Sequence, residues 1–292
     1  MEVEKVRVLL AVLEEGSLSG AAEALGYTPS GLSRSIAALE QETGFPLLHR
    51  EHRGVRPTAA CRELLPAMWQ LLSAQRQYRQ QADALRGLEQ GRLAIGCAYS
   101  SFLPELARTL AVFSAVHPGI RAELSEGSSS EISAAIREGR VDLAIISRRE
   151  GDFDWMPLRQ DQLVAVLPSR HPLAGCAAYP VERFAADDFI EILPQKETDN
   201  SRLFDRLSLR PRTRFSCGDT LSALSMVEAG LGVTLVNALL LENWPGRAAV
   251  LPLDPPQPVE IGVAVLSRAA ASPAAREFLH LLSGEPRGAT AG

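Results

Sequence analysis

GSLSGAAEALGYTPSGLSRSIAALEQE, residues 16–42, decides the fold of the N-terminal part of this chain. The stretch predicts two short helices joined by a tight turn. Ser17 is a typical N-cap for the first helix, and Gly26 is the residue type that commonly follows a helix end. Thr28 is a typical cap for the second helix, with Pro29 in its first turn, where proline costs no hydrogen bond.

The second of these helices, over residues 28–42, carries the first functional signal. Its apolar residues Leu32, Ile36 and Leu39 recur at i, i+4 and i+7, so they should face inward. The outer side is small, polar and basic, and it comprises Ser30, Gly31, Ser33, Arg34 and Ser35. A protruding helix of this kind fits a DNA major groove and can donate to phosphates and base edges. A surface helix in an ordinary bundle gives the same pattern, so both interpretations stay open at this point.

Composition places any DNA contact in one segment. The chain has 292 residues, 46% of them hydrophobic, which is enough for two or three domains, and its net charge is −5. Residues 1–27 hold two basic and five acidic side chains, whereas residues 28–62 hold five arginines against three glutamates. The positive charge beside the proposed helix is therefore local.

Cysteine usage and hydropathy predict a cytoplasmic protein. The four cysteines, Cys61, Cys97, Cys176 and Cys217, are widely spaced and form no CxxC, which argues against a disulfide framework or a zinc site. The acidic, amphipathic start MEVEKVRVLLAVLEE is unlike a signal peptide. No apolar run reaches the roughly 18 residues of a membrane span.

A charged hairpin and a long helix should follow the helix pair. HREHRGVRPT, residues 49–58, has the pattern of a short wing whose arginines Arg50, Arg53 and Arg56 could lie along a phosphate backbone. A solvated charged turn is the alternative. Residues 58–88 predict a long helix with a seam of apolar positions every three or four residues. That seam indicates either a dimerisation helix or a helix packed on its own domain, and Pro66 should kink it or end it early.

From about residue 90 the pattern changes to alternating strands and helices. Strands are expected at 92–97, 120–124, 141–146, 162–168, 189–192, 233–236 and 260–267. Helices are expected at 103–116 and 274–282, and around Ile132 and Leu224. Strand and helix alternate with short loops, which predicts an α/β architecture with a largely parallel sheet.

The order of these segments resembles the LysR-type transcriptional regulators over almost the whole chain. The matching stretches include GSLSGAAEALGYTPSGLSRSIAALEQETGFPLLHR, RGVRPTAA, GRLAIG, GRVDLAII and VEAGLGVTLV. Three features depart from the family pattern: Cys61, the Arg56-Pro57-Thr58 approach to the long helix, and Pro66 within it. These departures bear on the geometry of the linker helix more than on the function.

The resemblance implies an α+β multi-domain fold. Residues 1–58 would form a winged helix-turn-helix DNA-binding domain and residues 59–89 a linker and dimerisation helix. Two α/β subdomains of periplasmic-binding-protein type would follow, one from 90–162 and 267–284, the other from 163–266, with a disordered tail at 285–292. The implied partners are double-stranded promoter DNA, further copies of the chain in a homodimer or homotetramer, and RNA polymerase, without a membrane.

Two sets of site residues follow from this interpretation. For DNA they are Ser17, Thr28, Pro29, Ser30, Gly31, Ser33, Arg34, Arg50, Arg53 and Arg56. For a small effector between the subdomains they are Ser100, Ser101, Phe102, Ser128, Ser147, Gly218, Asp219 and Thr220. Most of the second set follow strands or begin helices, where hydroxyls and free N–H groups suit a polar ligand. Each is also a plausible simple N-cap.

Other function classes find less support in the sequence. The five histidines have no metal-ligand spacing, and the chain has no GxSxG, GxGxxG or P-loop motif, so neither an enzyme nor a cofactor or metal is expected. A redox role for Cys217, with Cys176 as a distant partner, would need an exposed thiol of lowered pKa. A cytoplasmic small-molecule receptor without a gene-regulatory role is the alternative function.

Overall fold

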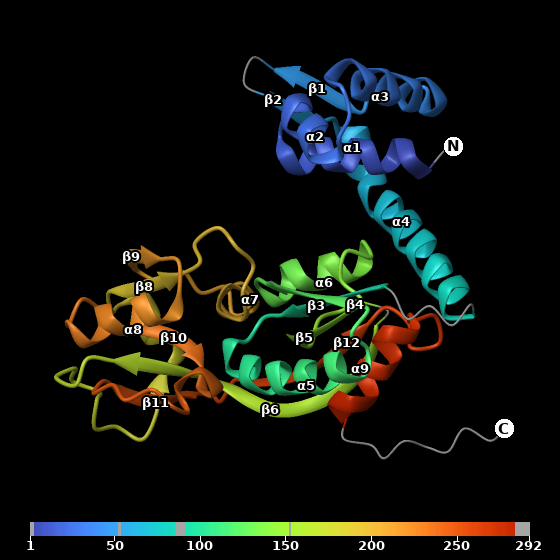
Figure 1. The fold of residues 1–292 in the computed structure, drawn as a ribbon. Helices are drawn as coiled ribbons and strands as arrows, with labels where there is room; N and C mark the ends of the chain where they lie inside the picture. Colours follow the sequence, from blue (N-terminus) through green and yellow to red (C-terminus); the bar gives the residue numbers. More distant parts are fainter. Residues whose placement is uncertain (1–2, 52–53, 86–90, 152, 284–292) are drawn as a thin grey trace. The chain divides into compact units, whose positions relative to one another are not determined.

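The computed structural model describes residues 3–51, 54–85, 91–151 and 153–283, and it divides into two compact units (Figure 1). One unit contains residues 1–88 with 137–140, and the other contains 89–136 with 141–292. The expected tail at 285–292 lies outside the described residues. Among the described helices, none is long and apolar enough to cross a membrane.

The N-terminal unit begins with three helices, α1 (Val3–Glu15), α2 (Leu18–Leu25) and α3 (Pro29–Thr43). Ser17 caps α2 and Thr28 caps α3, each accepting a hydrogen bond from the backbone N–H three residues later. Gly26 and Gly44 end these helices in the left-handed conformation, which glycine adopts without strain. The inward stripe of α3 is fully buried against α1, as the spacing predicted.

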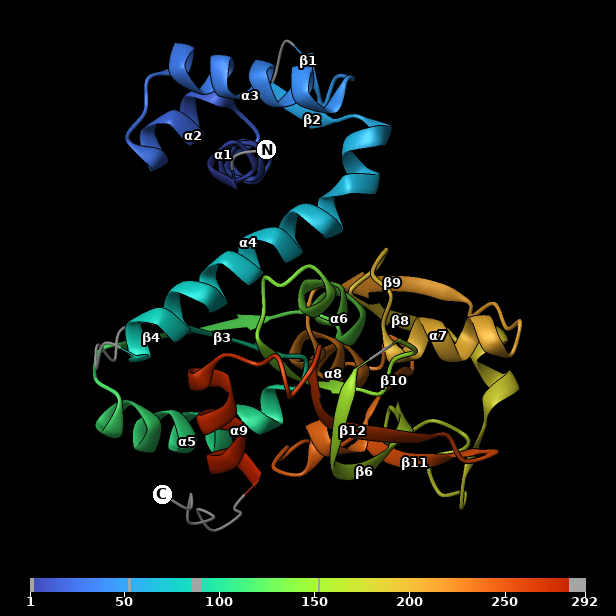
Figure 2. The ribbon, with the colours of Figure 1, turned by 90° about the vertical axis from the view of Figure 1, so that its right-hand side faces the viewer.

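A hairpin and the long helix α4 complete this unit. Strands β1 (Leu48–Glu51) and β2 (Gly54–Pro57) pair antiparallel and lead into α4 (Ala59–Leu85). Thr58 caps α4 through the N–H of Cys61 at 3.1 Å. Pro66 lies inside the helix and does not end it, and α4 runs on in Figure 2. Met68 of the expected seam is buried in the core of its own unit, whereas Tyr78 is 72% exposed.

The second unit has two lobes, and the first lobe is built on parallel strands. Strands β3 (Gly91–Cys97), β4 (Ile120–Glu126) and β5 (Leu143–Ser147) run parallel, as predicted. Helices α5 (Leu103–Val116) and α9 (Pro273–Ser283) cover one face of this sheet, and α6 (Ser129–Arg137) covers the other (Figure 1). Alternate side chains of β5 enter the two cores, because successive strand residues point to opposite faces.

The second lobe contains the remaining strands around the far half of β6 (Asp154–Leu167). Strands β10 (Thr234–Asn237) and β11 (Ala249–Asp254) pair antiparallel with β6, and β7 (Tyr179–Pro180) pairs parallel with β11. Strands β8 (Phe189–Ile192) and β9 (Thr213–Cys217) form a parallel pair beside them. Helices α7 (Asp199–Arg206) and α8 (Thr220–Glu228) cover this lobe, with short 3-10 turns at 181–185 and 238–241.

Strand β6 joins the two lobes as one continuous strand of 14 residues. Its first half pairs with β12 (Pro258–Val265) and its second half with β10 and β11. The crossing strands are antiparallel to their neighbours, so the largely parallel sheet expected from the sequence describes only part of the structure. Strand β12 also pairs with β5, and its residues Ile261, Val263 and Val265 are buried in the core of the first lobe.

Candidate functional site

The N-terminal half of α3 presents a polar surface above a buried apolar stripe. Leu32, Ile36 and Leu39 have no exposed surface, which fixes the rotation of the helix. Thr28, Pro29, Ser30 and Arg34 are exposed as a result, and Gly31, Ser33 and Ser17 are half-buried beside them. Thr28 and Ser30 also lie side by side, with their hydroxyl oxygens 3.3 Å apart. The first turns of this 15-residue helix thus carry exposed hydroxyls and a guanidinium.

The hairpin extends this polar surface. The guanidinium of Arg50 on β1 donates to the hydroxyl of Ser33 on α3 at 3.0 Å, so the strand and the helix form one polar surface. The carboxylate of Glu40 fixes the approach to β1, because it accepts from the N–H groups of Leu47 and Leu48 at 2.7 and 3.1 Å. Arg56 is exposed on β2. Arg53 lies outside the described residues.

Gly54 anchors the hairpin to the turn between α1 and α2. Its φ of +135° lies in the region that only glycine adopts readily, and a Cβ there would meet the carbonyl oxygen of Gly16 at 2.4 Å. The next residue, Val55, donates its N–H to the same Gly16 oxygen at 3.0 Å. This close approach of two backbones holds the hairpin beside the helix pair.

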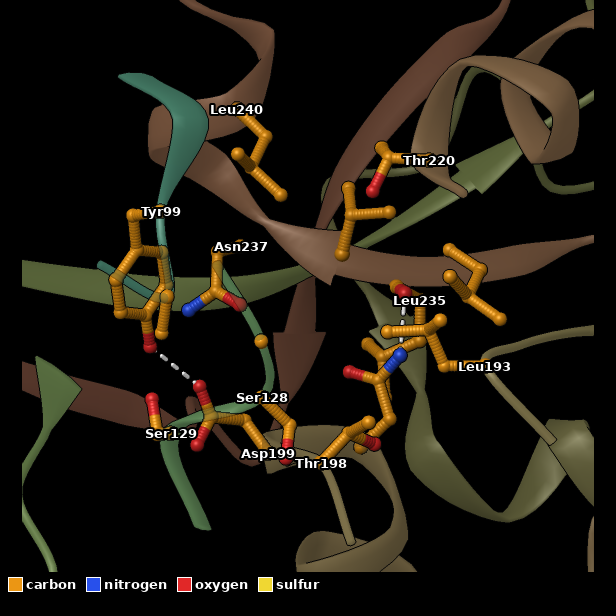
Figure 3. A pocket seen from close by; sticks show the side chains of 15 residues that line it. Tyr99, Ser128, Ser129, Leu193, Thr198, Asp199, Thr220, Leu235, Asn237 and Leu240 are labelled. Carbon is orange, nitrogen blue, oxygen red and sulfur yellow. Dashed lines mark hydrogen bonds between the residues drawn. The ribbon is translucent and has the colours of Figure 1, made fainter. Parts of the chain in front are cut away.

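A cavity of about 110 Å³ lies between the two lobes of the second unit. Its lining comes from the loops after β3 and β4, from the first turns of α7 and α8, and from β10 (Figure 3). Most lining groups are uncharged hydroxyls, amides and aliphatic side chains: Ser128, Ser129, Thr198, Asn200, Thr220, Asn237, Ile192, Leu193 and Leu240. The cavity therefore suits a small ligand that is mainly held by hydrogen bonds and apolar contact.

Asp199 is the charged residue of this lining, and it bridges the lobes. Standing in the first turn of α7, its carboxylate accepts from the hydroxyls of Tyr99 and Ser147 at 2.6 Å each, and from Arg149 at 2.9 Å. Arg149 and Asp199 are 5% and 13% exposed, so this is a buried ion pair. Burial and the neighbouring carboxylate raise the pKa of Tyr99, which keeps its hydroxyl protonated as a donor. Figure 3 shows the side chains of Tyr99 and Asp199 pointing toward one another.

The structure brings only part of the expected effector set to this cavity. Ser128 and Thr220 line it. Ser100, Ser101 and Phe102 form the 3-10 turn η1 (Ser100–Phe102), and they lie outside the lining together with Gly218 and Asp219. Ser147 does not line the cavity, but its hydroxyl donates to Asp199, which does.

Helix capping explains two of these positions. Asp219 caps α8, accepting from the N–H and the hydroxyl of Ser222 at 2.9 and 2.6 Å. Ser128 and Glu131 form a reciprocal cap at the start of α6, because each side chain accepts the backbone N–H of the other residue. The N–H groups that these caps occupy are not free for a ligand.

Several cavity residues have no signal in the sequence pattern. For Asp199 and Asn200, the only local signal is the cap before them: in TDNS, residues 198–201, a threonine stands three residues before a serine, which is the spacing of a capping box. Nothing local, however, indicates that Asp199 reaches Tyr99 and Arg149 in the other lobe. Those contacts depend on how β6 places the two lobes.

The surroundings of Cys217 oppose a redox role. Burial raises the pKa of this thiol, and its sulfur lies 3.3 Å from the carbonyl oxygen of Asp219. A raised pKa lowers the fraction of thiolate, which is the reactive form.

Comparison with known proteins defines the family. Residues 3–62 match the bacterial regulatory helix-turn-helix proteins of the LysR family, and residues 86–286 match the LysR substrate binding domain. A probable HTH-type transcriptional regulator, LrrA, of Synechococcus elongatus is 29% identical over 285 residues, which covers 97% of this chain and 96% of that protein. An uncharacterised HTH-type regulator, YnfL, of Escherichia coli is 29% identical over 97% of this chain and 98% of its own.

Solved structures show the same fold. A full-length OxyR variant from Pseudomonas aeruginosa has a TM-score of 0.66 at 21% identity, covering 97% of this chain and 94% of its own. HinK, a LysR family transcriptional regulator from the same organism, has a TM-score of 0.53 at 21% identity over 97% and 98% of the two chains.

The chain belongs to the LysR family and is a LysR-type transcriptional regulator, with a helix-turn-helix DNA-binding domain and a substrate-binding domain. The family consists of regulators and not of enzymes, as the motifs indicated. The alternative, a small-molecule receptor without a gene-regulatory role, is wrong, because the relatives that match over nearly the whole chain are transcriptional regulators.

Proposed function

We propose that α3 enters the DNA major groove and that its exposed residues make the specific contacts. Thr28, Pro29, Ser30, Gly31, Ser33 and Arg34 would face the groove, with Ser17 at the start of α2 close to the phosphates. Arg34 is the residue best suited to base reading, since a guanidinium can bind guanine through two hydrogen bonds. The observation that carries this proposal is the complete burial of Leu32, Ile36 and Leu39, which turns the polar face outward.

The wing arginines would hold the backbone. Arg50 lies on β1 and Arg56 on β2, and Arg50 donates to Ser33 of α3. We assign the same role to Arg53 from its place in the sequence alone. Guanidinium groups beside a recognition helix fix its register through phosphate contacts, which carry affinity but no sequence information.

The protein would act as a homodimer or homotetramer in the cytoplasm, where two copies of α3 can read two half-sites of a promoter. The surface of α4 around Tyr78, which is 72% exposed, is the one that we assign to pairing with a second copy. A contact with RNA polymerase at the promoter belongs to the same proposal.

The cavity between the lobes would bind a small polar effector through Ser128, Thr220 and their neighbours. The effector acts by binding one arrangement of the two lobes more tightly than another, since a ligand without that preference shifts no equilibrium. The position of β6, which runs through both lobes, makes lobe movement the natural response to a ligand in this cavity.

Fluorescence anisotropy with DNA fragments from the chain's own upstream region tests the DNA-binding part. The full-length protein should bind a specific fragment, and Arg34→Ala should weaken that binding more than binding to unrelated duplex. If the protein ignores every duplex at low ionic strength, the DNA-binding proposal fails. A screen of small polar metabolites by thermal shift, repeated with Thr220→Val, tests the cavity separately.

A further inference from the structure

A second cavity, of about 210 Å³, shares only Asp199 with the lining of the first. It is bounded by Ser147, Arg148 and Arg149 after β5, by Arg202 and Arg206 on α7, and by Gln257 before β12. Four arginines line it against two carboxylates, those of Asp199 and Glu260. The lining thus carries an excess of two positive charges.

On the α7 side of the cavity, one arginine pairs with a carboxylate just outside the lining and the other with a neutral group. Arg202 and Arg206 stand one helical turn apart, so both side chains lie on the same face of α7. Arg206 donates to the side-chain oxygen of Gln257, a neutral group. The amide of Gln257 is held in that orientation, because its nitrogen donates to the carbonyl oxygen of Pro255 at 2.9 Å. Arg202 pairs at 2.7 Å with Glu197, which lies outside the lining.

The floor of the cavity already holds a carboxylate. The buried guanidinium of Arg149 donates to Asp199 at 2.9 Å and to the hydroxyl of Ser147 at 2.6 Å. Asp199 belongs to α7, so the anion that Arg149 binds here is a side chain of the protein itself. A guanidinium that donates to one carboxylate in this way can donate to a free oxyanion with the same geometry.

We propose that this arginine-lined cavity binds a small anion with two or more negative charges on oxygen, such as a phosphate-bearing or polycarboxylate metabolite, which competes with Asp199 for Arg149. Arg202 and Arg206 would take the end of the anion farther from Arg149. A bound anion would release Asp199 from its bridge between the lobes, and so it would act on the first cavity without entering it. The site is separate from the effector cavity assigned above.

Trp155 provides the measurement. Its indole N–H donates to Glu260 at 2.7 Å, and the guanidinium of Arg148 lies 5.7 Å from its ring, and both partners line the cavity. Titration of the full-length protein with inorganic pyrophosphate, and separately with citrate, should give a saturable change in tryptophan fluorescence that Trp155→Phe removes. Isothermal calorimetry on the same samples measures affinity independently of the fluorophore. The anion that binds more tightly shows whether the site prefers a phosphate-bearing ligand or a polycarboxylate.

Substitutions distinguish a specific anion site from a general effect of the protein's positive charge. Arg206→Ala should weaken the anion by about tenfold or more, since a charge-assisted pair is lost, and Arg206→Lys should do so less. Arg210→Ala, which removes an 83% exposed arginine of the same lobe from outside this cavity, should have no effect. Asp199→Asn should tighten binding severalfold, because it removes the competing carboxylate.

Four results would overturn the proposal: dissociation constants weaker than about 1 mM for both anions, equal binding of acetate, equal loss in Arg206→Ala and Arg210→Ala, or unchanged affinity in Asp199→Asn. Promoter binding by the unliganded variants is measured alongside. Normal promoter binding with no anion binding would refute this site and leave the DNA-binding function intact.

Discussion

The hydroxyl of Tyr99 lies 2.6 Å from the carboxylate of Asp199, although the two residues are 100 positions apart in the chain and belong to different lobes. Arg149 and Ser147, which belong to the same lobe as Tyr99, donate to the same carboxylate. This cluster ties the start of α7 to the loops after β3 and β5. Three side chains of one lobe thus hold a single carboxylate of the other beside the effector cavity. The first prediction concerns the removal of that carboxylate.

Asp199→Ala should lower the free energy of unfolding by about 3–5 kcal/mol, because it leaves the Arg149 guanidinium buried without its anion. Asp205→Ala on the same helix is the matched control. Its ion pair with Arg210 is exposed on both sides, so the loss should stay below about 1 kcal/mol. Urea unfolding followed by circular dichroism compares the two, and equal losses would contradict the role given to Asp199.

Alkaline pH should weaken the same cluster. The pKa of Tyr99 is raised in the folded chain by burial and by Asp199. Its contribution to stability is therefore complete below the ordinary tyrosine pKa of about 10 and is lost as the pH rises above it. The urea midpoint should fall with rising pH in that range, and Tyr99→Phe should flatten the fall. Tyr78→Phe, on an exposed side chain, is the control and should leave the slope as it is.

Arg34→Ala should lower the affinity for a specific promoter fragment by about 1–3 kcal/mol, the usual value of one base-reading pair. Arg34 is exposed on the outer face of α3, and its removal leaves the buried stripe intact. Gln41→Ala, at the exposed far end of the same helix, should change nothing. Unaltered promoter affinity in Arg34→Ala would remove this residue from the base-reading set.

Arg50→Ala should weaken binding to every duplex alike. One phosphate contact fewer should reduce the slope of log affinity against log salt by about one. Anisotropy titrations at several salt concentrations, with specific and unrelated fragments, measure both quantities. A loss confined to the specific fragment would show instead that Arg50 acts by positioning Ser33 for base contact.

Gly54→Ala should displace the hairpin and destabilise the N-terminal unit by about 2 kcal/mol or more, because the new Cβ needs a strained φ and clashes with the Gly16 oxygen. Gly44→Ala tests strain alone, since its φ is +82° and nothing lies within 4 Å of the added atom. That variant should cost roughly 1 kcal/mol. Similar effects of the two substitutions on stability and DNA affinity would mean that the contact with Gly16 is unimportant.

The sequence by itself determined the local elements of the N-terminal unit. Ser17, Gly26, Thr28 and Pro29 act on their nearest neighbours through caps and fixed backbone angles, so their roles can be read from residue type and spacing. The inward face of α3 follows from helical periodicity in the same way.

Tertiary structure decided the rest. The sequence predicts that Pro66 kinks α4 or ends it early, and the early end is wrong, because the helix continues to Leu85. Part of the seam of α4 packs in the core of its own unit, and this packing offsets the hydrogen bond that a proline removes. The effector residues were assigned by local rules, and those rules identify caps such as Asp219 as readily as ligand contacts. The Tyr99–Asp199–Arg149 cluster and both cavities exist only because β6 and β12 bring distant segments together, and no local pattern encodes a contact between residues 100 positions apart.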